Sequence, residues 1–335
     1  MRILVTGGLG YIGAHIVATL LNDPKVEYVF IVDNLINSHE EKLNAFRDLG
    51  QVEKLTFYKS DLQNLGELNR IFAHSKPDFV IHLAGLKSVA QSTRWPIEYY
   101  NNNMLTTMNL LTAMRENNIY NLIFSSSATV YDPTKTTPFT EDSPTGRGLT
   151  NPYARTKFFI EEYLKDIYMS EPNKWNISIL RYFNPIGAAH PILKEQNKPL
   201  NPEAPSRPNN LYPIVLQVAE GKRPYLEVFG TDYPTPDGTA IRDYIHVQDL
   251  AEGHVAVAEK HKSAGYQVYN LGTGRGTSVK EFVDTFNAVN NKSLQIRNTQ
   301  RRPGDIAISV ADVSKAETIL GWKAKRTLAE SLKVE

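Results

Sequence analysis

The sequence predicts an α/β protein in which a doubly wound parallel sheet is followed by a smaller C-terminal lobe. Short apolar runs alternate with segments of helical length through the first half of the 335 residues, a pattern typical of strands joined by crossover helices. The apolar runs are nearly continuous, as expected for strands that are buried on both faces of a sheet. Proline then becomes frequent, which predicts loops laid over this scaffold.

The expected strands follow one another along the chain, and a small or polar residue comes after most of them. They are Ile3–Val5, Tyr28–Val32, Leu55–Tyr58, Phe79–Leu83 and Leu122–Phe124. The spacing of apolar side chains predicts helices between them at Ala14–Leu21, Leu65–Ala73 and Asn103–Arg115. Because the strands of such a sheet run parallel, their carboxyl ends form one edge, where ligands bind.

A second lobe begins where the composition changes, after about residue 183. Ten prolines lie between Pro185 and Pro236, a density that breaks long helices. We expect one domain over residues 1–182 and a substrate-binding lobe over residues 183–335. A helical pattern over Val247–Lys260 predicts that a segment of about 241–262 returns to the first domain.

Composition excludes several kinds of function. Lys and Arg total 37 against 36 Asp and Glu, so net charge gives no reason to bind nucleic acid or a membrane. The chain has no cysteine, which excludes disulfides and thiolate nucleophiles, and its histidines lack paired spacing, so we predict no metal. We see neither a secretory leader nor an apolar span of ~20 residues, and expect a cytoplasmic protein.

Glycines follow the first strand in the pattern of a dinucleotide site. Gly8-Leu9-Gly10-Tyr11-Ile12-Gly13 matches GxGxxG. Gly7, Gly10 and Gly13 also follow one another at intervals of three residues. Such a loop lets a pyrophosphate approach the backbone and opens a helix whose N-terminus favours anions. Asp33 closes the second strand, where a carboxylate binds ribose hydroxyls and repels a 2′-phosphate. We therefore predict a Rossmann-type domain that binds NAD rather than NADP.

Three side chains near the fifth strand suit acid–base chemistry at an alcohol carbon. Ser127 follows that strand, and Tyr153 and Lys157 are four residues apart in an expected helix, so they share a face. A neighbouring ammonium favours phenolate over phenol. We therefore expect Lys157 to lower the pKa of Tyr153 from its reference value of ~10 and make it a base. Ser127 can share the hydrogen bond of a substrate hydroxyl.

The sequence is similar to a known family from Met1 to about Trp322. The glycine loop, the Ser127, Tyr153 and Lys157 trio, Ala84-Gly85-Leu86-Lys87 and Arg181-Tyr182-Phe183-Asn184-Pro185 resemble the extended short-chain dehydrogenases/reductases. More narrowly, Ser125–Tyr131, Pro208-Asn209-Asn210-Leu211 and Asp237–Val247 resemble the UDP-glucose 4-epimerases within that family. Asp132 and Ala154 depart from the family, which usually has Gly at both positions. These departures concern loop geometry rather than chemistry.

The resemblance implies an isomerase that inverts C4 of a UDP-hexose through a transient 4-keto sugar, with NAD unchanged at the end. Tyr153 would take the proton of the sugar 4-hydroxyl, Ser127 would bind O4, and Lys157 would tune Tyr153 and bind the nicotinamide ribose. The residues that match cofactor contacts are Gly7, Gly10, Tyr11, Ile12, Gly13, Asp33, Asn34, Asn37, Ser38, Asp61, Leu62, Leu83, Ala84, Gly85, Lys87, Asn102, Ser125, Tyr153, Lys157 and Tyr182. From position alone, Asp61 fits a helix N-cap equally well.

The implied substrate is a UDP-sugar anchored by its diphosphate and uridine, so that the sugar alone can rotate. Arginine suits this anchor because its planar fork grips phosphate oxygens, although Arg242 taken alone fits a surface ion pair with Asp243. The residues that match substrate contacts are Lys87, Ser127, Tyr153, Phe183, Asn184, Asn210, Leu211, Tyr225, Phe229, Arg242, Arg302, Asp305 and Ser309.

The resemblance also bears on the breadth of the sugar pocket. In the family, the residue four places after the Asp of Arg-Arg-x-Gly-Asp lies beside the sugar C2, and here that residue is Ser309. Serine is small enough to admit a 2-acetamido group, so we expect UDP-N-acetylhexoses to be substrates as well. The alternative is that Ser309 is a half-exposed strand residue and another side chain closes the pocket.

Single positions help to distinguish other functions that the same fold could have. A 4,6-dehydratase needs a carboxylate just after the position of Ser127, and Ala128 and Thr129 stand there instead, which disfavours dehydration. A uronate epimerase or a decarboxylase stays open. A non-catalytic NAD-sensing regulator would have lost Tyr153 or Lys157, and both are present. The resemblance further implies a homodimer paired through helices at Asn103–Arg115 and Ala154–Met169.

Overall fold

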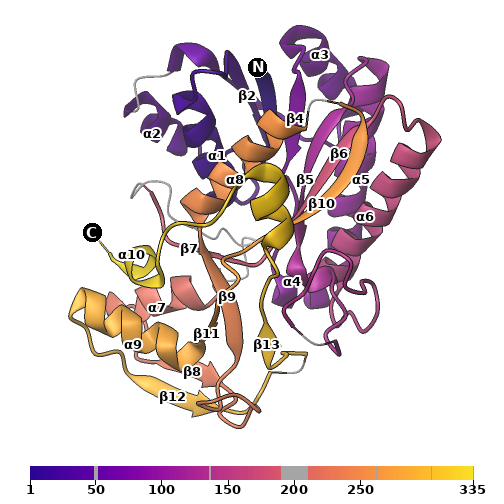
Figure 1. Cartoon of the computed structure of the whole chain (residues 1–335). Helices are drawn as coiled ribbons and strands as arrows, with labels where there is room; N and C mark the ends of the chain where they lie inside the picture. Colours follow the sequence, from indigo (N-terminus) through magenta and orange to yellow (C-terminus); the bar gives the residue numbers. More distant parts are fainter. Residues whose placement is uncertain (49–51, 136, 190–209, 262, 303, 335) are drawn as a thin grey trace.

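Seven parallel strands form the large sheet of the computed structural model, which describes residues 1–48, 52–135, 137–189, 210–261, 263–302 and 304–334. Their order is β10-β6-β5-β4-β1-β2-β3 (Figure 1). The strands are β1 (Arg2–Thr6), β2 (Tyr28–Asp33), β3 (Leu55–Lys59), β4 (Phe79–His82), β5 (Asn121–Ser127), β6 (Asn176–Tyr182) and β10 (Gly265–Leu271). Strand order reverses between β1 and β4, which opens a crevice at their carboxyl ends.

Helices cover both faces of this sheet. On one face, α1 (Tyr11–Asn22) packs beside α8 (Val247–Lys260); on the other lie α3 (Leu65–Ser75), α5 (Pro96–Glu116) and α6 (Pro152–Ser170) (Figure 1). Side chains of β1 alternate between the faces, so Ile3 and Val5 join the first core and Leu4 joins the second. The shorter helices are α2 (Lys42–Asp48), η1 (Val52–Lys54), α4 (Val89–Arg94) and η2 (Ala128–Val130). None of the described helices combines the length and apolarity needed to cross a bilayer.

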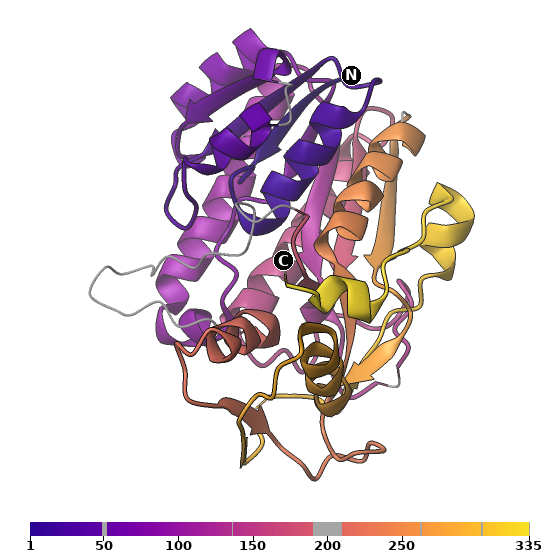
Figure 2. The same cartoon turned by 90° about the vertical axis from the view of Figure 1, so that its left-hand side faces the viewer.

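The second lobe lies beyond the carboxyl edge of the large sheet (Figure 2). In it, β9 (Ile241–His246) pairs with β7 (Asn184–Ile186), β11 (Gly276–Ser278) and β13 (Ile308–Ser309), and β8 (Leu226–Phe229) pairs with β12 (Ile296–Thr299). Its helices are α7 (Leu211–Ala219), α9 (Val279–Asn290) and α10 (Leu328–Leu332). They bury a separate core that includes Val215, Phe282 and Phe286.

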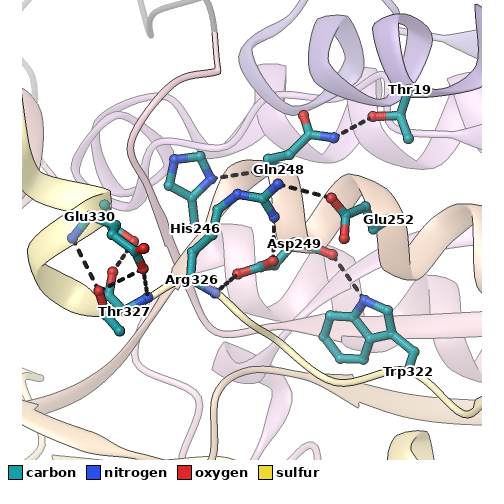
Figure 3. A network of polar contacts seen from close by, with 10 residues as sticks. Thr19, His246, Gln248, Asp249, Glu252, Trp322, Arg326, Thr327 and Glu330 are labelled. Atoms are coloured by element: carbon teal, nitrogen blue, oxygen red, sulfur yellow. Dashed lines mark hydrogen bonds and ion pairs between the residues drawn. The ribbon is translucent and has the colours of Figure 1, made fainter. Parts of the chain in front are cut away.

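The C-terminal segment ties the second lobe to the first. Trp322, just after the π-helical turn η4 (Ala316–Leu320), is buried in the first core, whereas Leu332 is buried in the core of the second lobe. Between them, Arg326 donates through its backbone N–H and its guanidinium to the fully buried Asp249 at the start of α8, over 3.0 and 2.5 Å (Figure 3). A second guanidinium nitrogen bonds Glu252. These contacts fix the lobe against α8.

The predicted fold class is confirmed, and all five predicted strands are present. The domain bounds differ from the prediction of a return over 241–262: β9 belongs to the small sheet, and the chain rejoins the first domain through α8 and then β10. Because β10 is an edge strand with four half-exposed residues, it lacks the continuous apolar pattern of the inner strands. We therefore propose 247–271 as the returning segment. The part of the proline-rich stretch over 190–209 lies outside the described residues.

Candidate active site

The glycine loop between β1 and α1 forms a cradle that side chains would fill. Gly7 has a φ of 68°, a left-handed conformation that favours glycine, and a Cβ there would lie 2.9 Å from the nitrogen of Ala84. A Cβ at Gly13 would lie 2.2 Å from the carbonyl oxygen of Gly7. No side chain caps α1, and its first turn, Tyr11-Ile12-Gly13, presents the positive end of the helix dipole. This geometry fits a pyrophosphate.

A pocket lies beside this cradle at the carboxyl ends of β1, β2 and β4. Nine residues predicted to contact the cofactor line it: Gly7, Asp33, Asn34, Asn37, Asp61, Leu62, Ala84, Gly85 and Asn102. Sequence reasoning missed other lining residues, among them Ser60, Leu86 and Thr106. Leu86 belongs to the Ala84-Gly85-Leu86-Lys87 motif, whereas Ser60 and Thr106 follow no motif and only the fold brings them to the pocket.

The buried carboxylate of Asp33 organises the loops around this pocket. It accepts hydrogen bonds from the backbone of Leu9 at 3.0 Å and Leu35 at 2.9 Å, and from the Ser38 hydroxyl at 2.7 Å. Since a carboxylate offers about four lone-pair sites, Asp33 keeps capacity for a ribose hydroxyl. Its negative charge also disfavours a 2′-phosphate.

Asp61 is a pocket residue rather than a helix cap. Its carboxylate accepts from the Asn34 amide at 2.9 Å and from the backbone of Gln63 at 2.8 Å. The N-cap of α3 is Asn64, whose side chain accepts from Glu67 N. The alternative that Asp61 caps a helix is therefore wrong.

The remaining predicted cofactor residues surround the cradle. The Leu83 N–H donates to the carbonyl oxygen of Thr6, and the Lys87 ammonium lies 5.7 Å from the centre of the Tyr11 ring. Tyr182, the last residue of β6, hydrogen-bonds Ser125 and has its hydroxyl 2.5 Å from the buried His254. The ends of β4, β5 and β6 thus continue the binding edge away from the glycine loop.

Ser127, Tyr153 and Lys157 meet at the carboxyl end of β5. The side chain of Asn151 caps α6, so Tyr153 falls in the first turn of that helix, where it hydrogen-bonds Ser127. Lys157 lies one turn further on and is 6% exposed. Its ammonium donates to the carbonyl oxygen of Ser125 at 2.5 Å and lies 4.7 Å from the centre of the Phe124 ring.

The pKa values in this trio differ from the prediction. Burial raises the pKa of the Tyr153 hydroxyl above its ordinary value, and the hydrogen bond with Ser127 opposes that rise. Burial lowers the pKa of Lys157 to about 8, with the nearby Glu161 carboxylate opposing the fall. The expectation that Lys157 lowers the pKa of Tyr153 is therefore not met here, because burial raises that pKa and the group that opposes the rise is Ser127 rather than Lys157.

The departures at Asp132 and Ala154 are accommodated locally. The Asp132 carboxylate accepts from the backbone and the hydroxyl of Thr134, at 2.9 and 2.7 Å, and so closes its own turn. Ala154 is buried in the first turn of α6, and its N–H donates to the Asn151 cap at 2.9 Å. Neither residue displaces the trio.

The second lobe gathers predicted anchor residues around one tyrosine. Arg242 on β9, together with Arg302 and Asp305 before β13, acts electrostatically on the buried Tyr233. Arg302 donates to Asp305 at 2.9 Å and lies 4.8 Å from the centre of the Phe229 ring. Sequence reasoning missed Tyr233, whose buried hydroxyl has no hydrogen-bond partner within the described residues.

Arg242 is not paired with Asp243. Its guanidinium donates to the carbonyl oxygen of Ile241 at 2.8 Å. The Asp243 carboxylate is fully buried and accepts from Thr273 and Gly274 at 2.7–2.9 Å. The alternative of a surface ion pair between the two is therefore wrong.

An apolar cluster connects this lobe to the catalytic strand. Phe183 is buried with Ala311 and Phe139, and Ala128, the neighbour of Ser127, packs against them. Ser309, two residues before Ala311, is 9% exposed and pairs in register with Arg242. Ser309 is thus buried rather than half-exposed, on the strand that lies between the anchor and the cluster.

The other predicted substrate residues lie at the rim of the lobe. Asn184 opens β7, while Asn210 is exposed immediately before α7, which begins at Leu211. The ring of Tyr225 lies 4.2 Å beneath the guanidinium of Arg297. Pro208-Asn209 and Pro303, which belong to the predicted motifs, lie outside the described residues.

Known proteins are similar to this chain over nearly its whole length. Residues 3–272 match the model of the NAD dependent epimerase/dehydratase family. The UDP-glucose 4-epimerase of Bacillus subtilis (strain 168) is 48% identical over 331 residues, covering 98% of this chain and 94% of that protein.

Solved structures of 4-epimerases are similar as well. The UDP-glucose 4-epimerase from Bifidobacterium longum, solved in complex with NAD+ and UDP, is 44% identical with a TM-score of 0.91, covering 99% of this chain and 96% of that one. The UDP-Glc/GlcNAc 4-epimerase from Campylobacter jejuni is 33% identical with a TM-score of 0.83, covering 98% and 97%.

Proposed function

Since the chain belongs to the NAD dependent epimerase/dehydratase family, we propose that it is an isomerase, a UDP-glucose 4-epimerase that interconverts UDP-galactose and UDP-glucose. The observation that carries this proposal is the meeting of Ser127, Tyr153 and Lys157 at the sheet edge that also holds the glycine cradle. Relatives named UDP-glucose 4-epimerase, similar over nearly the whole chain, support it.

The first domain fits NAD. The glycine cradle would hold the pyrophosphate, Asp33 the ribose nearest the adenine, and the pocket beside Asp61 the adenine itself. A bound NAD would supply the acceptor for the hydride of the sugar C4 and the donor that returns this hydride to the opposite face. The NAD+ in the similar Bifidobacterium longum structure supports this assignment.

The trio moves the proton that accompanies each hydride transfer. Tyr153 accepts the proton of the 4-hydroxyl and gives it back after the 4-keto sugar has turned over. Ser127, whose side chain is hydrogen-bonded to Tyr153, holds the sugar O4 within reach of the Tyr153 hydroxyl. The Lys157 ammonium lies one turn along the same helix and would bind the nicotinamide ribose, whereas the pKa of Tyr153 is set here by burial and by Ser127.

The second lobe would anchor the part of the substrate that does not react. Arg242 and Arg302 supply guanidinium groups for the diphosphate, and Phe229 lies beneath Arg302 at the same place. The UDP in the Bifidobacterium longum structure supports this role. Ser309 leaves room beside the sugar C2, and we extend the proposal to UDP-N-acetylglucosamine and UDP-N-acetylgalactosamine. The name of the Campylobacter jejuni relative, a UDP-Glc/GlcNAc 4-epimerase, supports that extension.

We also propose a cytoplasmic homodimer. The outer faces of α5 and α6, which pack together, expose large apolar side chains, an arrangement typical of interaction surfaces. They are Ile97, Leu105, Met108, Phe159 and Met169. The absence of cysteine suits a reducing compartment. Light scattering tests the dimer, and a monomeric mass at micromolar concentration would contradict it.

One assay tests the catalytic proposal. The purified protein is incubated with UDP-galactose without added oxidant, and UDP-glucose is measured, together with the NAD released on denaturation. We expect conversion and stoichiometric NAD. Conversion of a UDP-uronate but not of UDP-galactose would favour a uronate epimerase or decarboxylase, and no conversion of either with NAD bound would favour the NAD-sensing regulator.

A further inference from the structure

Helix α6 carries three side chains, four residues apart, that meet the three serines at the end of β5. Tyr153 hydrogen-bonds the Ser127 side chain, and Lys157 donates to the Ser125 carbonyl oxygen. One turn further, Glu161 accepts a hydrogen bond from the Ser126 hydroxyl at 2.5 Å. The proposed reaction uses the first two side chains. The third has the same spacing on the same face, and no role so far.

Glu161 is a buried carboxylate that accepts three side-chain hydrogen bonds. It is 3% exposed, and besides Ser126 it accepts two hydrogen bonds from Arg181 on β6, at 3.1 and 2.7 Å. Arg181 is 5% exposed, donates to the carbonyl oxygen of Glu141 at 2.9 Å and lies 4.8 Å from the centre of the Tyr131 ring. Buried ion pairs often stabilise a fold no better than apolar residues of the same size. Stability alone therefore gives little reason for this pair beside the catalytic strand.

We propose that Glu161 is a positioning residue for the epimerisation. Its carboxylate, held by Arg181, fixes the end of β5 through Ser126 and keeps the Lys157 ammonium charged on the Ser125 carbonyl. The proposal rests on the proposed function for its kinetic consequences, whereas its structural consequence, the charge on Lys157, is independent of the substrate.

Among the described groups around Lys157, Glu161 supplies the negative charge that favours the ammonium form. Burial lowers the pKa of Lys157 to about 8, and Glu161 opposes that fall. From β4, His82 also faces Lys157, but burial lowers the pKa of His82 to about 3, so it is neutral and offers no countercharge. Tyr153 shares the helix, and its pKa is raised by burial. Without Glu161, the pKa of Lys157 therefore moves toward neutral pH.

The groups that face Glu161 also bear on a pH experiment. Arg181 carries the positive charge on β6, and Tyr131 lies against the guanidinium. From β10, the Tyr266 hydroxyl donates to the Glu161 carbonyl oxygen at 3.4 Å. The pKa of both tyrosines is raised, mainly by burial, so neither titrates between pH 6 and about 9. Between pH 6 and about 9, a pH-dependent change in activity that originates beside Glu161 therefore reports on Lys157.

The test compares two variants that separate the charge of Glu161 from its hydrogen bond with Ser126. Glu161→Gln removes the charge and keeps an oxygen for Ser126, whereas Ser126→Ala keeps the charge and removes the hydrogen bond. For Glu161→Gln we expect turnover of UDP-galactose to fall on the order of tenfold, with KM and NAD content unchanged and the alkaline limit of activity moved to lower pH. For Ser126→Ala we expect a smaller loss and an unmoved pH limit.

A second measurement does not depend on the reaction. The Lys157 side chain is titrated by NMR in protein labelled at the lysine ε-carbon, its resonance being assigned by its loss in Lys157→Met. We expect the midpoint to lie lower in Glu161→Gln than in wild type. An unchanged midpoint would overturn the proposal even if the wild type failed to epimerise UDP-galactose, a failure that contradicts the proposed function alone.

Folding of the variant is controlled by removing both charges. If Glu161→Gln does not fold because Arg181 is left unpaired, the double variant Glu161→Leu with Arg181→Met gives an apolar replacement. We expect it to fold and bind NAD, and to lose turnover as Glu161→Gln does. Wild-type turnover in either folded variant would show that Glu161 has only a structural role and would refute the proposal.

Discussion

The hydroxyl of Tyr11 donates a hydrogen bond to the carbonyl oxygen of Gly187 over 2.6 Å. It joins the first turn of the glycine-loop helix to the segment that follows β7. A second bond runs in parallel, from the backbone N–H of Ala189 to the buried His15 of the same helix, at 3.1 Å. The helix proposed to hold the cofactor and the strand that begins with Asn184 are thus held together, as hydride transfer between bound groups requires.

Gly187→Ala should loosen this junction. Gly187 has a φ of 81°, and a Cβ there would lie 2.6 Å from the His246 ring. We expect strain and the clash to lower the free energy of unfolding by about 2–4 kcal/mol. Gly221→Ala is the matched control, because Gly221 has a φ of 73° and nothing within 4 Å of the added Cβ, so only about 1 kcal/mol is expected. Equal losses in urea unfolding would show that the His246 contact costs nothing.

Tyr153→Phe should fold normally and lose at least ~100-fold in turnover, because the base is removed while the ring and its packing stay. Initial rates with UDP-galactose measure the loss. Tyr168→Phe is a control on the same helix, where the tyrosine ring packs against Tyr266 rather than Ser127, and it should keep its activity. A Tyr153→Phe enzyme close to wild type would mean that another group takes the proton.

The residues that could be predicted from the sequence are those with a local pattern. The glycine loop is contiguous, and Tyr153 and Lys157 are one helical turn apart, so spacing alone placed them together. The pairing of Arg181 with Glu161 joins a strand to a helix, and the bond from Tyr11 to Gly187 spans 176 residues. Such contacts depend on the completed fold. The pKa of Tyr153 was predicted in the wrong direction for the same reason, because burial is a tertiary property.

Asp33→Ala should weaken NAD binding and ease entry of NADP. Loss of the charged acceptor costs on the order of 1.5 to 3 kcal/mol, part of it through the loop bonds from Leu9 and Leu35. Removal of the charge ends the repulsion of a 2′-phosphate. Titration of cofactor-free protein with both cofactors measures the preference. Ser38→Ala removes one donor to the same carboxylate and keeps its charge, so it should still prefer NAD. An unchanged preference in Asp33→Ala would contradict the ribose role.

Three buried histidines should make the fold sensitive to mild acid. Burial lowers the pKa of His82 to about 3 and those of His246 and His254 to about 4, against 6.5 in the unfolded chain. The unfolded state therefore binds more protons below pH 6.5, and stability falls as pH decreases from there toward the folded values. At pH 5 the loss is about 2 kcal/mol for each histidine.

Urea unfolding at pH 7 and pH 5 measures this loss. His246→Asn is the informative variant, since His246 caps α8 through its ring and Asn is a good cap. The difference in unfolding free energy between the two pH values should shrink by about 2 kcal/mol in that variant. If wild-type stability is the same at both pH values, these histidines are not held neutral by the fold.

Ser309→Tyr should narrow the substrate range. Ser309 is buried on β13 opposite Arg242 on β9, so a larger side chain at this position is placed beside the proposed diphosphate anchor, on the strand that leads to the Phe183 cluster. We expect the wild type to epimerise both the plain and the N-acetylated UDP-hexose pairs. The Tyr side chain should exclude the 2-acetamido group and lower activity on the N-acetylated pair selectively.

Assays of both sugar pairs with both proteins give the answer. Ser309→Thr, which adds a single methyl group, is the matched control and should retain more of the N-acetylated activity than Ser309→Tyr does. A wild type that is active on UDP-galactose and inactive on UDP-N-acetylgalactosamine would refute the role of Ser309 in admitting the larger sugar. Loss of both activities together in Ser309→Tyr would instead mean that the tyrosine disturbs the anchor at Arg242, which the KM for UDP-galactose would report.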